Sequence, residues 1–328
     1  MKVALVFRKL YKKRLSKFLI IFFAILAIGT IWQNIMLYYE GKELNYPGQL
    51  IDVNNHKMHI FGKGNGSPTI VLTVGSGTPC AYTDFYFIQQ EISKSTRTVT
   101  YDRPGYGWSK STSIPRTVDE QVNDLHEILD KAGEKPPYIL VGHSLSSLEV
   151  IRYAQLFPKE VSGIVLIDGG NPEYYADYYA PGAVLLNYFL EGLRDCGVVR
   201  ALGSIGILTP MVNEDKRYKL LPKELSKIDK MMFYKNLGNK TNRSEIRNMN
   251  ENAKKIIDNG KLGDIPLVIL TSKGDSYWEK TQRELKNWSN NSMQEDIIGA
   301  NHYIHWDKPN IVIEKIQGLV KELRINVH

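Results

Sequence analysis

The stretch YILVGHSLSSLEVIRYAQLFP, residues 138–158, decides the fold. Its first five residues have the composition of a buried strand, and an amphipathic helix follows directly and ends before Pro158. Between the two lies GHSLS, residues 142–146, with small residues two before and two after Ser144. A sharp corner from strand to helix needs small residues at those positions, and it raises the central side chain clear of the sheet. We therefore expect the Ser144 side chain to stand clear at the carboxyl edge of a sheet.

Apolar strands and amphipathic helices alternate on both sides of this stretch. Two segments with period-two alternation, joined at Asn54-Asn55, predict a hairpin before the first buried strand. Strands of continuous apolar character separated by helices are typical of a mostly parallel sheet with helices on both faces. The further strands that we expect lie at 69–74, 97–102, 163–168, 266–272 and 293–299.

The corner at Ser144 resembles the nucleophile elbow of the α/β-hydrolase superfamily, whose pattern is G-x-S-x-G. This chain has Ser146 where the family usually has glycine, so we expect a slightly tighter corner with the chemistry retained. The resemblance extends from residue 50 to residue 325 and implies an α/β-hydrolase fold. It also implies a serine nucleophile activated by a histidine and a carboxylate.

The resemblance implies an oxyanion hole made by two backbone amides. The helix that follows the elbow directs the amide of Leu145 at the group that Ser144 attacks. The segment TVGSGTP, residues 73–79, lies where the family carries its oxyanion loop, which makes the amide of Ser76 the second donor. The family's usual histidine in this loop is Val74 in this chain.

The general base is expected after the last strand. The segment IIGANHYIHWDKP, residues 297–309, resembles the family's G-x-x-H pattern before a final helix and assigns His302 as the base. His305 lies one helical turn further on, and we interpret it as a packing or helix-surface residue.

Two carboxylates could orient the base. Asp275 follows the strand at 266–272 and precedes His302 by 27 residues, as the family's acid commonly does. Some members of the family place the acid after the preceding strand, which would make it Asp168. We favour Asp275, and both choices keep the chain order Ser, Asp, His.

The alternation of strands and helices stops between residues 169 and 264. This insert begins with four tyrosines in six residues and continues with apolar and then Lys/Asn-rich helical segments. It lies where the α/β-hydrolase fold usually carries its lid, so we expect it to cover the site and to form an apolar or acyl pocket. The segment YDRPGYGWS, residues 101–109, resembles a family loop, and in it we interpret Asp102 and Arg103 as structural residues.

The net charge of +7 arises from the N-terminus. Seven of the 42 basic residues lie in residues 1–17, and the remaining 35 balance the 35 acidic residues, which excludes a nucleic-acid-binding surface as the origin of the charge. Residues 18–39 carry no charge and span about 33 Å as a helix, at about 1.5 Å per residue. We expect a cytoplasmic basic segment at 1–17, a membrane anchor at 18–39 and an exported hydrolase domain at 48–328. A cleaved signal peptide with a secreted domain is the alternative, although no Ala-x-Ala site follows the apolar run.

The cysteines Cys80 and Cys196 are 116 residues apart and permit either one disulfide or two free thiols. Neither has a Cys/His cluster nearby, so we expect no metal site and no cofactor. The sequence predicts a carboxylesterase- or lipase-like serine hydrolase that cleaves a small-molecule or lipid-like acyl substrate through an acyl-enzyme. The alternatives are a related aminopeptidase, carbon–carbon hydrolase or cofactor-free haloperoxidase, and a non-catalytic binding protein with this fold.

Overall fold

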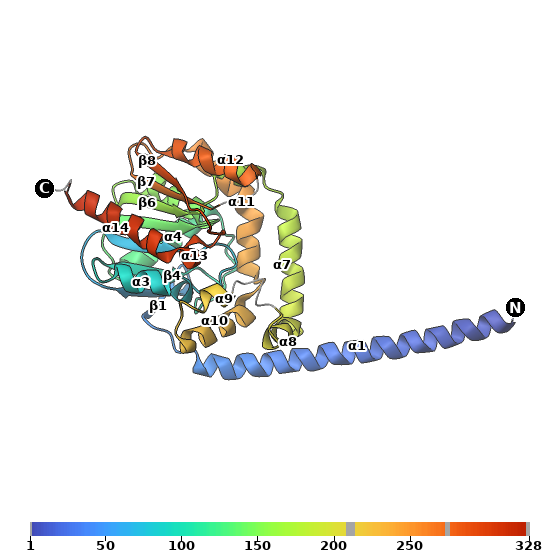
Figure 1. Cartoon of the computed structure of the whole chain (residues 1–328). Coiled ribbons are helices and arrows are strands. Elements are labelled where there is room, and N and C mark those ends of the chain that lie inside the picture. Colours follow the sequence, from blue (N-terminus) through green and yellow to red (C-terminus); the bar gives the residue numbers. More distant parts are fainter. Residues whose placement is uncertain (1, 208–213, 273–275, 326–328) are drawn as a thin grey trace.

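The computed structural model describes residues 2–207, 214–272 and 276–325. Its centre is an eight-stranded sheet in the order β1-β2-β4-β3-β5-β6-β7-β8 (Figure 1). The pairs β1–β2 and β2–β4 are antiparallel, and every other pair in the sheet is parallel. The strands are β1 (Gln49–Val53), β2 (His56–Lys63), β3 (Thr69–Thr73), β4 (Thr98–Asp102), β5 (Tyr138–His143), β6 (Val161–Ile167), β7 (Leu267–Thr271) and β8 (Ser292–Asp296).

Helices cover both faces of the sheet, which confirms the predicted architecture. Alternate residues of β5 point to opposite faces, because successive side chains of a strand do so. Leu140 packs in the core with helices α4 (Val118–Lys131) and α5 (Ser146–Leu156). Val141 packs in the second core with α3 (Tyr86–Ile92) and α14 (Pro309–Ile325). The near-continuous apolar character of β3, β5 and β7 reflects burial on both faces.

The segment between β6 and β7 is helical. It contains α6 (Pro172–Asp177), α7 (Ala180–Asp195), α8 (Val198–Ser204), α9 (Glu214–Arg217), α10 (Lys223–Asn236) and α11 (Lys240–Asp258). These helices lie together along one side of the molecule (Figure 1). We call this segment the insert. The remaining short helices are α2 (Ala81–Asp84), α12 (Ser276–Glu284), the 3-10 helix η2 (Leu285–Trp288) and α13 (Ile304–Asp307).

The N-terminal helix α1 (Lys2–Glu43) is continuous and extends far beyond the globular body (Figure 1). Its residues 11–43 form one helix that is long and apolar enough to cross a membrane, with a mean hydropathy of 2.2. A membrane anchor and a signal sequence share these properties. The C-terminal part of α1 packs against α7 and α10 of the insert, and Gln33 and Glu40 are buried there. The helix therefore belongs partly to the folded domain.

Both cysteines are free. Cys80 is buried beside α2, and Cys196 is half-buried at the end of α7. The sequence permitted either one disulfide or two free thiols, and the structure contains two free thiols.

Candidate active site

The elbow at Ser144 is a strained turn between β5 and α5. Ser144 has a φ of 56°, in the left-handed region that residues with a Cβ rarely adopt. The turn is so close that a Cβ on residue 142 would lie 3.0 Å from the Val150 side chain, which explains Gly142. The strain is maintained by the packing of the strand and the helix on either side, and it presents the Ser144 hydroxyl at the carboxyl edge of the sheet.

Ser146 stands where the family usually has glycine, and its hydroxyl group forms hydrogen bonds. Its Oγ lies 2.9 Å from the carbonyl oxygen of Thr73 and 2.9 Å from that of His143, and it is fully buried. One hydroxyl proton is thus shared between the end of β3 and the end of β5. A glycine could not make this link, so Ser146 ties the elbow to the strand that leads into the loop at 74–79.

Three side chains that are distant in the sequence form one chain of hydrogen bonds. The Nε2 atom of His302 lies 2.9 Å from the Oγ of Ser144, and its Nδ1 atom lies 2.6 Å from the Oδ2 of Asp168. With the proton on Nδ1, the imidazole donates to the carboxylate, and its Nε2 accepts from the hydroxyl. This is the arrangement that a general base needs in order to remove the proton of a serine.

The carboxylate in this chain is Asp168, the alternative that the sequence left open. It directly follows β6, the neighbour of β5 in the sheet, and it is buried with a φ of 44°. The backbone N–H of Ser272 donates to its Oδ1 at 2.8 Å, and the Ser272 hydroxyl donates to its Oδ2 at 2.9 Å. Asp275, which we favoured from the sequence, lies outside the described residues. Three hydrogen bonds, two from Ser272 and one from His302, therefore orient the Asp168 side chain.

A second histidine supports the first. His143, at the end of β5, is buried, and its Nε2 lies 3.0 Å from the backbone carbonyl oxygen of His302. Burial, followed by the neighbouring His305 and His302, holds the pKa of His143 well below its ordinary value of 6.5. His143 is thus neutral and donates its Nε2 proton to the loop that carries the base. His305 is also buried and contacts Asp84 at 3.1 Å, in the packing role that we expected.

The loop that contains Ser76 lies beside the nucleophile and is fixed by the insert. Ser76, Ser144 and Leu145 line one cavity together with His302. The side-chain amide of Asn242, on α11, donates to the Oγ of Ser76 at 2.8 Å.

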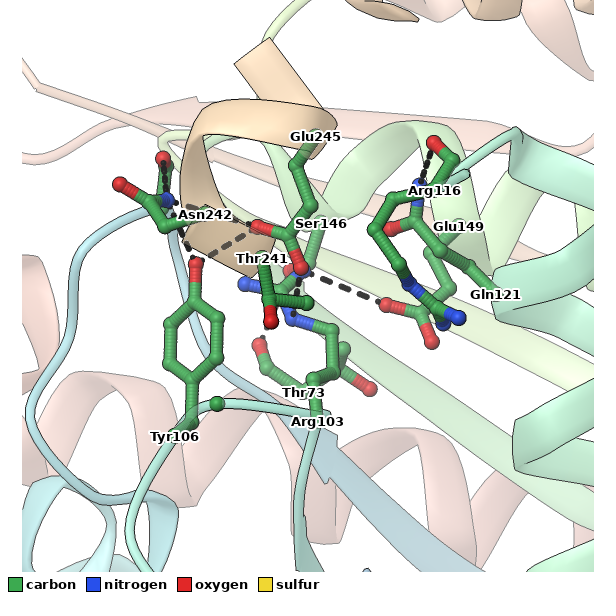
Figure 2. A network of polar contacts seen from close by, with 12 residues as sticks. Thr73, Arg103, Tyr106, Arg116, Gln121, Ser146, Glu149, Thr241, Asn242 and Glu245 are labelled. Carbon is green, nitrogen blue, oxygen red and sulfur yellow. Dashed lines mark hydrogen bonds and ion pairs between the residues drawn. The ribbon is translucent and has the colours of Figure 1, made fainter. Parts of the chain in front are cut away.

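Arg103 joins this loop to two helices. Its Nη2 donates to the carbonyl oxygen of Gly75 at 3.0 Å, while Glu149 of α5 and Glu245 of α11 lie 3.3 and 3.4 Å from its guanidinium. Figure 2 shows Arg103 between these carboxylates, with the Tyr106 hydroxyl directed at Glu245 from the opposite side. The network links the loop that contains Ser76, the elbow helix and the insert, and Arg103 is buried within it, as expected of a structural residue.

Sequence reasoning missed three members of this network, Asn242, Glu245 and Glu149. Asn242 and Glu245 belong to no motif, and they lie more than 130 residues from the groups that they contact. Glu149 offered one signal, because it is an acid between Leu148 and Val150 on the apolar face of α5. Burial raises the pKa of Glu149, although Arg103 opposes this shift.

The insert covers the nucleophile. The cavity above Ser144 has a volume of about 390 Å³. Its walls come from α6 and the turn after it, from α7 and α11, and from Trp278 of α12; the residues are Tyr174, Tyr175, Tyr178, Ala183, Ile246 and Met249. The tyrosine-rich start of the insert thus contributes part of the wall of this cavity. Apolar groups dominate the rest, as in pockets that bind uncharged substrates.

Comparisons with known proteins agree with this architecture. The family model described as alpha/beta hydrolase fold matches residues 70–309. The Bacillus subtilis (strain 168) protein YbdG is 28% identical over 303 residues, which cover 90% of this chain and 92% of that protein. A 2-hydroxy-6-oxononadienedioate/2-hydroxy-6-oxononatrienedioate hydrolase of Paraburkholderia phymatum is 29% identical over 154 residues, 45% of this chain and 52% of that protein.

Solved structures show the same fold. An epoxide hydrolase of Bacillus megaterium in complex with an inhibitor superposes with a TM-score of 0.64 at 18% identity, covering 83% of this chain and 100% of that chain. A thermophilic esterase of Thermogutta terrifontis superposes with a TM-score of 0.63 at 18% identity, covering 84% and 98%. The sheet order, the elbow and the match over residues 70–309 lead to one conclusion. The chain belongs to the α/β-hydrolase fold family.

Proposed function

We propose that the protein is a serine hydrolase that cleaves an ester or a related acyl bond through an acyl-enzyme intermediate. The observation that carries this proposal is the continuous hydrogen-bond chain from Ser144 through His302 to Asp168, with donor–acceptor distances of 2.9 and 2.6 Å. A serine at the elbow supports acyl transfer, whereas epoxide hydrolysis in this fold would call for an aspartate at that position.

The residues have the following roles in the proposal. Ser144 attacks the carbonyl carbon while its proton passes to Nε2 of His302, and the amides of Ser76 and Leu145 stabilise the oxyanion. His302 then protonates the leaving group, and the acyl group remains on Ser144. A water molecule gives its proton to His302 and attacks the acyl carbon, which releases the acid and restores the serine. Asp168 holds the imidazole in the tautomer that both steps require.

Labelling with a fluorophosphonate probe tests the nucleophile. We expect the probe to label the wild-type protein and not Ser144→Ala, and we expect hydrolysis of p-nitrophenyl esters to disappear with the label. Ser147→Ala is the matched control. Ser147 is a buried serine of α5, and its hydroxyl donates to the carbonyl oxygen of Gly170. A folded wild-type protein that takes no label would instead indicate a binding protein that retains the fold.

Carbon–carbon bond hydrolysis is a second candidate function. It is favoured by the 29% identity to the hydrolase of Paraburkholderia phymatum over 154 residues. Such an enzyme would use the same serine and histidine, so the fluorophosphonate label alone does not separate the two. Turnover of a vinylogous 1,5-diketone acid in preference to simple esters would favour this candidate.

We further propose that α1 anchors the hydrolase domain (48–328) to the cell membrane, with residues 1–17 cytoplasmic and the domain on the other side. The basic flank and the uncharged run at 18–39 support this direction. Packing of α1 on the insert supports an uncleaved anchor, because the buried Arg200 has Glu40 of α1 as its carboxylate partner. Protease digestion of the domain in intact cells tests the topology, and protection from digestion would contradict it.

A further inference from the structure

A second cavity lies between the insert and the loop that carries Ser76. It has a volume of about 480 Å³, which is within the range of about 300–1,000 Å³ of ligand pockets. Most of its wall is apolar and comes from α7, α8 and α10, including Leu186, Phe189, Leu190, Val199, Leu202 and Phe233. The proposed reaction leaves this cavity without a role.

Of the three charged residues that line it, Arg217 and Asp229 form an ion pair with each other, and the ammonium of Lys230 lies 5.0 Å from the centre of the Tyr218 ring. Arg217 forms ion pairs with Asp84 and with Asp229, and its guanidinium lies 4.5 Å from the centre of the Trp306 ring. An anionic ligand would have to compete with two buried carboxylates for this guanidinium. The cavity is therefore suited to an uncharged alkyl chain.

This cavity adjoins the nucleophile cavity. Ser76 and His302 line the cavity of Ser144, and the residues that follow them, Gly77 and Tyr303, line the second cavity. Neighbouring residues of the same two loops therefore line both cavities, which places the second cavity beside the one that contains Ser144.

The same part of the insert contacts the apolar helix α1. Gly29 of α1 and Gly197, between α7 and α8, approach so closely that neither backbone leaves room for a Cβ. Small residues allow such backbone contact between helices in membranes. Residues 18–28 extend past this contact for only about 16 Å, at about 1.5 Å per residue, against a hydrocarbon thickness of about 30 Å. The α7–α8 corner must therefore enter the membrane interface if α1 is to complete its span.

The outer surface of this corner is apolar. Leu185 and Phe189 on α7 are 70% and 62% exposed, and Ile205 after α8 is 69% exposed. Figure 1 shows α7 running across the direction in which α1 leaves the body, on the side of the body to which α1 projects. Exposed apolar side chains of this kind are favourable when a helix lies in a bilayer interface. Leu186 and Phe189 also line the cavity, so α7 contributes both to the cavity wall and to the exposed apolar surface.

We propose that the second cavity binds the alkyl chain of a lipid ester, which enters from the bilayer beside α1 while its ester group lies at Ser144. This inference rests on the proposed serine hydrolase function and gives it a substrate class: uncharged esters with a long chain that reside in the membrane.

Photo-crosslinking tests the cavity without requiring turnover. Full-length Ser144→Ala protein is reconstituted in phosphatidylcholine vesicles that contain a monopalmitoyl glycerol with a diazirine near the middle of its chain. We expect cross-links to the cavity walls of α7, α8 and α10. Adding Val199→Trp, which fills the cavity at a buried position, should reduce them by about tenfold or more. Lys254→Trp adds the same side chain to the exposed face of α11 and should leave them unchanged.

Leu190→Trp, at a half-buried cavity position, serves as a second blocking variant if Val199→Trp does not fold, as judged by thermal unfolding. Cross-links confined to α1 and the outer surface of α7, or unchanged in a folded blocking variant, would overturn the inference.

Hydrolysis separates a failure of this inference from a failure of the proposed function. These measurements use protein that retains Ser144. We compare kcat/KM for p-nitrophenyl palmitate with kcat/KM for p-nitrophenyl butyrate, and either blocking variant should lower the palmitate-to-butyrate ratio by about tenfold or more. One outcome is that the wild type takes the fluorophosphonate label and hydrolyses both esters while no folded blocking variant changes the kcat/KM ratio. That outcome overturns the alkyl-chain site in the second cavity and leaves the proposed enzyme function intact. A wild type that takes no fluorophosphonate label overturns the enzyme, whereas cavity cross-links would then still support a lipid-binding site.

Discussion

At the scale of single residues, the site depends on which carboxylate orients His302. Asp168 Oδ2 lies 2.6 Å from Nδ1 of His302 and is buried. Asp275 also follows a strand that ends at this edge of the sheet, which is why the sequence permits both.

Replacing each acid by its amide separates them. We expect Asp168→Asn to lower kcat for p-nitrophenyl butyrate by about 10³–10⁴-fold, because the imidazole loses the partner that holds its tautomer. Asp275→Asn, the matched control, should remain close to wild type. The reverse result, with thermal unfolding unchanged in both proteins, would restore Asp275 as the acid.

His143 makes stability depend on pH. Burial, His305 and His302 keep its pKa well below 6.5 in the folded state, whereas in the unfolded chain it titrates near that value. Below about pH 6.5 the unfolded state therefore binds more protons, and the free energy of unfolding falls as pH falls, by up to about 1.4 kcal/mol per pH unit for one proton.

We expect His143→Gln to reduce this slope in urea unfolding between pH 6.5 and 5. Val150→Ala, which removes buried methyl groups and no titrating group, should lower stability and keep the slope. An equal slope in wild type and His143→Gln would show that other groups determine the pH dependence.

At the scale of elements, α11 has two functions. It covers the nucleophile cavity through Ile246 and Met249, and it holds the loop at 75–77 through Asn242. Further along the same helix, Asn252 accepts from the N–H of Val118 at 2.8 Å and so fixes the start of α4. The helix thus offers two buried asparagines, of which one contacts the loop that contains Ser76.

We expect Asn242→Ala to lower kcat by about 10–100-fold, because the loop that supplies the proposed Ser76 amide loses a fixed partner. Both substitutions should destabilise the fold by a similar amount, about 1–3 kcal/mol, but Asn252→Ala should leave kcat near the wild-type value. The comparison requires kcat and thermal unfolding of both variants. Equal losses of kcat would mean that α11 affects the site only through overall stability.

At the scale of the whole molecule, α1 and the insert are joined by one buried ion pair. Arg200 of α8 donates to Glu40 at 2.8 Å through Nη2 and to Gln33 at 2.7 Å through Nε. Near the end of α1, Glu43 pairs with Lys227 at 2.7 Å on the exposed surface. Both pairs join α1 to the insert, one through α8 and the other through α10, and their burial is very different.

Removing each cation tests this connection. Arg200→Ala leaves the Glu40 carboxylate buried without a partner and should destabilise the protein by about 3–5 kcal/mol. Lys227→Ala should change stability by less than about 1 kcal/mol, because the pair is exposed. Thermal unfolding in detergent solution measures both, and the double variant Arg200→Met with Glu40→Leu should recover most of the loss. Similar small losses in both single variants would show that α1 is not integrated in the fold.

Local patterns were sufficient for most of the architecture. The strand–corner–helix at 138–158 and the alternation of apolar strands with helices predicted the α/β-hydrolase fold, which the sheet order and the family match confirm. These features can be predicted from the sequence because hydrophobic periodicity and turn residues depend on amino acids that are close together in the chain. For the same reason the sequence could place Ser144 and His302 at the ends of strands.

Tertiary structure alone decided which groups meet. Asp168 follows β6, which lies directly beside β5, and its carboxylate contacts His302. The contacts of Asn242, Glu245 and Arg200 join elements that are more than 130 residues apart, and no local pattern encodes such distances. Burial and hydrogen-bond geometry in the packed molecule select these partners, because an unpaired buried charge or amide is costly only once folding has removed its water.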